Sequence, residues 1–242
     1  MARTDTLAHY LTDVADAIRT KTGSSDPIQA STFDTAISNI PSGATYTVTS
    51  GQQSTPNYQK IMEQINTVKV DDDATSLQYL FYNCKATSFP KVTNVTNKIT
   101  NMQYMFAYCD YVTSLDFSGY DTSKVTTMKY MFGMNTGGSP LHTLDLSSFD
   151  TTEVTDMSSM FNLLRNLAVL DISNFDFSSV TNFAYMFKNC GDWSLQSNGA
   201  YDYGIPYVYV KDAAAQTWVL TQSNGHPSSW STDNVIIKSN NT

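Results

Sequence analysis

The chain has little of what nucleic-acid-binding and membrane proteins need. It carries 14 lysines and arginines against 22 aspartates and glutamates, so its formal net charge is −8. Nucleic-acid binding requires a basic patch, and docking on an anionic membrane surface requires positive charge. No apolar run approaches the ~20 residues that a membrane-spanning helix needs. We therefore expect neither nucleic acid nor membrane insertion among its interactions.

Motifs for catalysis and metal binding are also missing. The sequence contains no phosphate-binding Walker loop, no GxGxxG and no HExxH. Its three cysteines form no CxxC pair, so a zinc site is not expected. The acidic run 71–73 lacks the spaced ligands and the glycine of a calcium loop and is expected to be a solvated turn. The three histidines are isolated from one another. We expect no cofactor, no metal and no enzymatic activity.

What the chain does have is one short sequence motif, the repeated phrase, that occurs five times. Each copy carries apolar residues at positions i, i+3 and i+4, as in Met128, Met131 and Phe132, which predicts one face of a short helix. A threonine precedes every copy and is expected to cap that helix. The copies end at intervals of 25 to 29 residues, in Phe81, Phe106, Phe132, Phe161 and Phe187. A period of this size predicts a solenoid, in which each unit buries its apolar face against its neighbours.

A second phrase lies ten residues before the later copies. Apolar and polar residues alternate over 115–118, 144–147 and 170–173, which predicts a strand in each unit. Residues 89–92 lie in the same register, although Pro90 lacks an N–H and suits a sheet edge or a coil. Each unit is therefore predicted to run through a strand, a turn, a capped helical turn and a loop.

The repeat also carries a family resemblance. Residues 144–161, Leu-Asp-Leu-Ser-Ser-Phe-Asp-Thr-Thr-Glu-Val-Thr-Asp-Met-Ser-Ser-Met-Phe, resemble the unit of BspA-like leucine-rich-repeat surface proteins. Residues 207–212 with Trp218 resemble the segment that often closes such arrays. The resemblance covers about residues 74–220. It implies an α+β repeat solenoid of the leucine-rich-repeat kind and a role in adhesion or in binding proteins and glycans.

The N-terminal segment resembles a different group of proteins. Its apolar residues stand at helical spacing before Gly23, and a second short helix is predicted to end at 41–43. Residues 4–43 are similar to a segment of tail and other structural proteins of bacteriophages. This resemblance implies a module that attaches the chain to other virion proteins or joins sister chains into a homo-oligomer. The alternative is a plain helical hairpin that caps the solenoid.

Together the two resemblances predict a non-enzymatic bacteriophage virion protein, either tail-associated or head-decorating, that binds a host surface protein or glycan. The chain starts with an amphipathic helix and not with an export signal, so we expect it to leave its bacterial host on the particle, by lysis. One alternative is a BspA-like adhesin on a bacterial cell surface. Another is a virion-borne glycan depolymerase, which needs one unique carboxylate pair, whereas the aspartates of this chain recur in every unit.

Tyrosines recur at one position of the repeat and are the first candidates for ligand binding. The position is about 200° around the predicted helix from its first apolar residue, given ~3.6 residues per turn, so it should lie off the core. Tyrosine offers a large contact area at low entropic cost. Ser159 fills the fifth copy, and the others are Tyr79, Tyr104, Tyr130 and Tyr185. Alternatively, each tyrosine packs against the loop of the next coil.

A second candidate surface is the polar side of the strands. Asp116, Asp145 and Asp171 recur there, although turn capping is the other explanation for these residues. Trp193 follows the last repeat and is either an exposed contact or an ordinary packing residue. Cys84, Cys109 and Cys190 share one repeat position, three residues after the phenylalanine. They are expected to be small buried residues, with a Cys84–Cys109 disulfide between adjacent coils as the alternative.

These patterns divide the chain into four parts. Residues 1–43 are the helical attachment module. Residues 44–66 are a connector and solenoid cap, with a short strand at 46–49 and a helix at 57–66. Residues 67–190 form the repeats. Residues 191–242 form a C-terminal cap with strands near 207–210 and 235–238, because a solenoid must cover its terminal apolar face.

Overall fold

The computed structural model describes residues 44–48, 65–135, 139–191, 193–195, 201–203, 206–221 and 230–238. The helical module predicted over 1–43 lies outside these residues. So does the helix predicted over 57–66, except for Ile65 and Asn66, which instead begin a strand.

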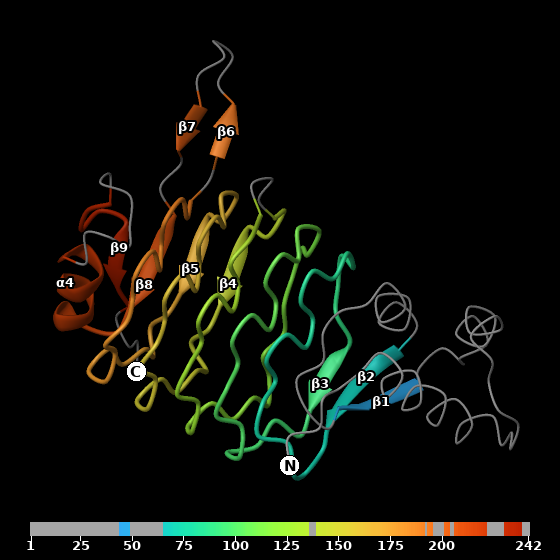
Figure 1. The fold of residues 1–242 in the computed structure, drawn as a ribbon. Helices are drawn as coiled ribbons and strands as arrows, with labels where there is room; N and C mark the ends of the chain where they lie inside the picture. The colour runs from blue at the N-terminus through green and yellow to red at the C-terminus, as the bar shows by residue number, and fades with distance from the viewer. Residues whose placement is uncertain are drawn as a thin grey trace, which may run out of the picture.

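The described chain winds as a solenoid, so the predicted repeat architecture is confirmed (Figure 1). Strands β1 (Ala44–Val48), β2 (Ile65–Val70) and β3 (Lys91–Thr93) pair in parallel at one end. Strands β4 (Thr143–Asp145), β5 (Val169–Asp171), β8 (Tyr207–Val210) and β9 (Val235–Ile237) form a second parallel sheet. Between β5 and β8 in the sequence, β6 (Trp193–Leu195) and β7 (Tyr201–Tyr203) form an antiparallel hairpin. This hairpin projects from the solenoid (Figure 1).

The strand predictions are largely confirmed. β4 and β5 lie within the phrases at 144–147 and 170–173 apart from their first residues, and β8 covers 207–210. The parallel ladder also extends beyond the repeats, because β1 pairs with β2 and β9 pairs with β8. One prediction is wrong: residues 115–118 form no strand.

The helices predicted in each repeat are also wrong. Among the described residues the one α-helix is α4 (Ala213–Thr221), which follows β8. The repeated phrase forms a run of tight turns instead. The Leu80 N–H donates to the Leu77 carbonyl at 3.1 Å, whereas the Tyr79 N–H donates to Gln103 of the next coil at 3.1 Å. A turn brings residues i and i+3 to the same side, so its apolar spacing imitates that of a helix.

The threonines before each phrase do not cap helices. The Thr126 hydroxyl donates to the carbonyl of Thr100 at 3.2 Å, and the Thr155 hydroxyl donates to that of Thr126 at 3.2 Å. The backbone N–H groups of the same residues donate to the same carbonyls. The threonines therefore form a ladder that joins consecutive coils.

A column of phenylalanine rings fills the core between the two sides of the coils. The five repeat phenylalanines are at most 2 % exposed. Each ring stacks on the next, with centroid separations of 5.2, 5.8, 5.9 and 5.5 Å along the column. The three cysteines are buried beside this column as thiols, so the alternative of a Cys84–Cys109 disulfide is wrong. The Cys109 thiol lies 3.0 Å from the carbonyl of Phe81.

Candidate functional site

The repeat tyrosines occupy a backbone conformation that side chains rarely adopt. In each copy a four-residue turn is closed by an N–H bond to the carbonyl three residues earlier, and its third residue has a positive φ. This is the arrangement of a type II turn, which normally takes glycine or asparagine at that place. The φ values are 62° for Tyr79, 57° for Tyr104, 56° for Tyr130, 56° for Ser159 and 60° for Tyr185. A bulky residue there costs about 1–3 kcal/mol of backbone strain.

Consecutive coils place three of these rings in one stack. The Tyr79 and Tyr104 centroids are 5.1 Å apart at an interplanar angle of 22°. The Tyr104 and Tyr130 centroids are also 5.1 Å apart, at 13°. These three residues therefore form a row of rings at coil spacing, and their role in ligand binding stays a prediction. They pack on one another, which neither of the two sequence interpretations specified.

Two further tyrosines widen the stack into a surface. Tyr82 lies edge-on to Tyr79, with centroids 5.2 Å apart at 90°, and its centroid is 5.2 Å from that of Tyr108. Tyr108 in turn lies edge-on to Tyr130 at 5.7 Å. All five rings are half-buried. We call Tyr79, Tyr82, Tyr104, Tyr108 and Tyr130 the tyrosine cluster.

Three phenols of the cluster, those of Tyr82, Tyr104 and Tyr108, stay uncharged at neutral pH. Burial raises the pKa of Tyr82 and of Tyr104, and the neighbouring phenols raise both further. Burial also raises the pKa of Tyr108, helped by its hydrogen bond to Tyr130. The hydroxyls are therefore available as hydrogen-bond donors and acceptors at the rim of an apolar surface.

The end of the cluster at Tyr130 is held by its neighbours. A Cβ atom on Gly133 would lie 2.2 Å from the Tyr130 ring, so the absence of a side chain there lets the ring fold over the backbone. The Asn162 amide of the next coil donates to the Tyr130 hydroxyl at 3.3 Å. Beyond this point Ser159 interrupts the row. Tyr185 is 52 % exposed, and the Lys188 ammonium lies 4.8 Å from its ring centroid.

The strand-side aspartates serve the backbone of their own turns. Asp116 accepts from the Ser118 N–H at 2.8 Å, Asp145 from Ser147 at 2.9 Å and Asp171 from Ser173 at 3.0 Å. Burial opposes the ionisation of Asp171, but its bonds to Lys238 and Ser173 outweigh that penalty and lower its pKa. Turn capping therefore accounts for the recurrence of all three. The side chain of Trp193 lies outside the described residues.

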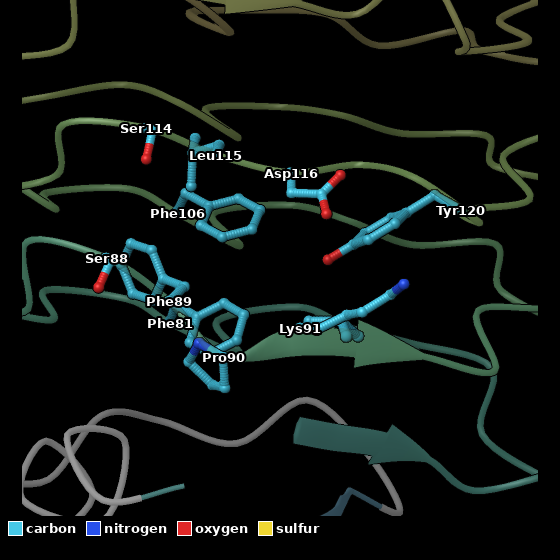
Figure 2. A pocket seen from close by; sticks show the side chains of 11 residues that line it. Phe81, Ser88, Phe89, Pro90, Lys91, Phe106, Ser114, Leu115, Asp116 and Tyr120 are labelled. Carbon is cyan, nitrogen blue, oxygen red and sulfur yellow. The ribbon is translucent and has the colours of Figure 1, made fainter. Parts of the chain in front are cut away.

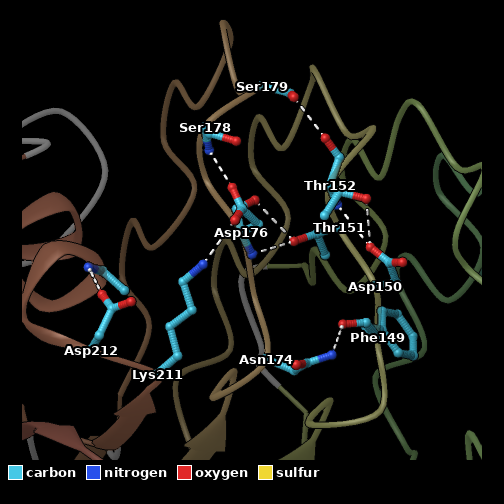
Figure 3. A network of polar contacts seen from close by, with 11 residues as sticks. Phe149, Asp150, Thr151, Thr152, Asn174, Asp176, Ser178, Ser179, Lys211 and Asp212 are labelled. Carbon is cyan, nitrogen blue, oxygen red and sulfur yellow. Dashed lines mark hydrogen bonds and ion pairs between the residues drawn. The ribbon is translucent and has the colours of Figure 1, made fainter.

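A second set of aspartates and threonines ties the later coils together (Figure 3). The buried Thr151 hydroxyl donates to the Asp176 carbonyl at 3.0 Å and accepts from the Asp176 N–H at 2.7 Å. The Asp176 carboxylate forms an ion pair with Lys211 at 2.8 Å. That bond, with those from Ser178, holds the pKa of Asp176 well below its usual range. These polar groups therefore bond to one another and stabilise the fold.

Other kinds of site find little support in the described part of the chain. It contains no group of three or more histidines, cysteines, aspartates or glutamates that could hold a metal ion. None of its helices is long and apolar enough to cross a membrane.

Sequence reasoning missed two members of the cluster. Tyr82 follows its repeat phenylalanine by one residue and Tyr108 follows its own by two. Their positions are not equivalent in the repeat, so alignment of the copies hides them. Only the stacking of adjacent coils brings them to one surface.

Comparison with known proteins places the chain in a protein family. Neither the search of curated proteins nor that of solved structures gives a match. The family described as "Mycoplasma protein of unknown function, DUF285" matches residues 75–201. That span begins with the first repeated phrase, ends at β7 and covers more than half of the 242 residues. Because this match covers more than half of the chain, the protein belongs to the DUF285 family.

Proposed function

We propose that this protein is a non-enzymatic binding scaffold and that the tyrosine cluster is its ligand-contacting surface. The observation that carries this proposal is the presence of bulky tyrosines where the backbone has a positive φ. Glycine or asparagine would fit the same turns with less strain. Retaining tyrosine there is explained if the side chains contribute something outside the fold, and observed strain of this kind often marks functional surfaces.

The geometry of the cluster indicates how a ligand would be held. Rings 5.1 Å apart leave no space for a second molecule between them. A ligand would therefore lie across the ring edges and hydroxyls of several coils, where it gains both apolar contact and hydrogen bonds. An extended glycan or a protein surface fits this description, and solenoids generally bind along such an extended surface.

The setting that we propose is the virion of a bacteriophage, with BspA-like repeats exposed on the particle. The support is the resemblance of residues 4–43 to phage structural proteins, which would attach the chain to other virion proteins or to sister chains. Several copies on one particle would turn weak contacts into strong adhesion. The competing setting is a bacterial cell surface, which the match to a family described from Mycoplasma favours.

Binding is tested with a triple variant, Tyr79→Ser, Tyr104→Ser and Tyr130→Ser. Serine already occupies this turn position at Ser159 with the same backbone conformation, so the variant should fold. We expect adhesion of the labelled protein to host cells or to a glycan array to fall at least about tenfold, since aromatic anchors dominate such surfaces. The control is Tyr111→Ser, an exposed tyrosine outside the cluster. Unchanged adhesion in a folded triple variant would overturn the proposal.

The setting is tested by immunogold electron microscopy of lysates of the source bacterium. Gold on tails or heads of particles would support the virion, and the labelled part would identify the location. Gold on intact cell surfaces without particles would instead establish the adhesin.

A further inference from the structure

A break in the strand-side ladder opens a pocket between two coils (Figure 2). Two backbone bonds join these coils on either side of the break: Thr113 N–H to the Thr87 carbonyl at 3.0 Å, and Asp121 N–H to the Val95 carbonyl at 3.1 Å. Between them, no described backbone bond links residues 88–94 to residues 114–120. The later strands β4 and β5 are paired at the equivalent place. The pocket has a volume of about 220 Å³.

The pocket is apolar at one end and polar at the other. Rings of the core column and of the strand segment, Phe81, Phe89 and Phe106, lie together with Leu115 and Pro90 at the apolar end. At the other end Asp116, Tyr120 and Lys91 lie close together, with the Tyr120 hydroxyl directed between the other two side chains (Figure 2).

The Tyr120 hydroxyl is unexplained by the fold. Tyr120 is only 8 % exposed, and its hydroxyl has no hydrogen-bond partner among the described residues. The residues at the same place in the next two coils are Phe149 and Phe175, which close the same turn and are fully buried. Packing therefore requires the ring but not the oxygen. The hydroxyl lines the pocket, where it is placed to donate a hydrogen bond to a ligand.

The two charged groups at this end have opposite signs. Lys91 lies close enough to help lower the pKa of Asp116, although the bonds from Ser118 contribute more, so the carboxylate is ionised at neutral pH. The Lys91 ammonium has no hydrogen-bond or ion-pair partner among the described residues, and both side chains are exposed. A carboxylate and an ammonium side by side complement a ligand that itself carries one charge of each sign.

The volume limits the size of that ligand. The pocket is smaller than the cavities of about 300–1,000 Å³ that enclose drug-sized molecules. It matches a single ring or branched side chain with a compact polar head. We propose that this pocket binds a free α-amino acid with an aromatic or branched apolar side chain. The side chain lies against the partly exposed Phe89 and Leu115, the ammonium group faces Asp116, and the carboxylate faces Lys91 and accepts from the Tyr120 hydroxyl.

This site goes beyond the proposed adhesion and is separate from it. None of the five residues of the tyrosine cluster lines the pocket. Loss of amino-acid binding would leave the proposed function intact, and the triple serine variant should bind amino acids as the parent protein does.

Isothermal titration of the full chain tests the proposal with L-phenylalanine and L-leucine as probes. We expect saturable binding with a Kd below about 1 mM. Phenethylamine lacks the carboxylate and 3-phenylpropionate lacks the ammonium, and each should bind at least about fivefold more weakly, because each loses a charge-assisted contact. No saturable binding of either amino acid would overturn the proposal. Binding of phenethylamine as tight as that of L-phenylalanine would overturn the assignment of a zwitterion.

Substitutions of the pocket residues test where the ligand binds. Tyr120→Phe copies the residue of the next two coils, so it should fold, and it should weaken L-phenylalanine binding about two- to tenfold. Asp116→Asn should weaken it more, because it removes the charge that faces the ammonium. The matched controls are Asp145→Asn, which caps the same kind of turn but does not line this pocket, and Tyr111→Phe. Equal affinities for the Tyr120→Phe and Tyr111→Phe variants would overturn the site.

Discussion

The coils of residues 75–135 and those of residues 139–191 share one core but differ on both outer sides. In the first group the turn side carries the stacked tyrosine cluster, and the strand side opens into a pocket beside residues 114–120. In the second group Ser159 replaces one repeat tyrosine and Tyr185 stands apart from the cluster, while β4 and β5 continue into the parallel sheet with β8 and β9. Residues 150–152 and 176–179 are cross-linked there by hydroxyl groups.

The difference indicates that core packing and the outer surface of a repeat protein can vary independently from coil to coil. The phenylalanine column must continue through every coil, because each coil is stabilised only by its neighbours. The outer positions carry no such constraint, so one group of coils can display aromatic side chains while the other closes its ladders. We infer that the later coils hold the structure and the earlier coils contact ligands.

The largest effect should come from the shared core. Phe132→Ala removes a fully buried ring that stacks on Phe106 and Phe161, and it should lower the free energy of unfolding by about 3–5 kcal/mol. Phe89→Ala should cost less than half as much, since Phe89 is only partly buried and borders the pocket. Urea unfolding followed by circular dichroism measures both. Equal losses would mean that the ring beside the pocket is packed as tightly as the phenylalanine column.

A smaller loss should follow from opening the hydroxyl ladder of the later coils. Thr151→Val keeps the shape of the side chain but leaves the Asp176 N–H and carbonyl without their partner, at a cost of about 1–3 kcal/mol. Thr126→Val, at an exposed rung of the other threonine ladder, should change the free energy of unfolding by no more than about 0.5 kcal/mol. The same urea unfolding experiment measures both variants. An unchanged free energy of unfolding in the Thr151→Val variant would show that the network adds no stability.

Acid should weaken the later coils through Asp176. Its pKa is lower in the folded chain than the ordinary value of about 3.9, so its contribution is complete above about pH 5 and is lost as the pH falls below about 4. Lys211→Gln should reduce this pH dependence, because it removes the main cause of the lowered pKa. The expected change in the free energy of unfolding is at most about 1 kcal/mol. Unfolding measured from pH 7 to pH 2 tests this. An unchanged slope in the variant would assign the acid sensitivity to other carboxylates.

The smallest change in stability should come from extending the cluster. Ser159→Tyr places a fourth ring beside Tyr130, and its stacking gain of about 0.5–1.5 kcal/mol should roughly offset the strain of the turn. Adhesion should rise, because the binding surface becomes longer. Ser148→Tyr, on the exposed strand side, is the control. Weaker adhesion by the Ser159→Tyr variant would show that the interruption at this position is part of the binding surface.

Much of the fold was open to prediction from the repeats, but the helices of each repeat and the strand at 115–118 were predicted wrongly. The period, the phenylalanine column and the strands β4 and β5 follow from residues that recur along the repeats, whereas β8 was predicted in the C-terminal cap. The helices were predicted wrongly because the i, i+3, i+4 spacing is common to helices and to successive turns. What separates the two is the acceptor of each N–H, and for Tyr79 that acceptor lies on Gln103 of the next coil.

The sequence by itself determined that the chain is a solenoid, which residues form its core, and which tyrosines recur at one turn position. These features depend on residue type and spacing, which are visible along a single segment. The tertiary structure decided that three of those tyrosines stack and that Tyr82 and Tyr108 join them. It also decided that Tyr120 places its hydroxyl in a pocket at a break in the ladder. Those features depend on how adjacent coils are registered and where their hydrogen bonds fail, and only the folded chain contains that information.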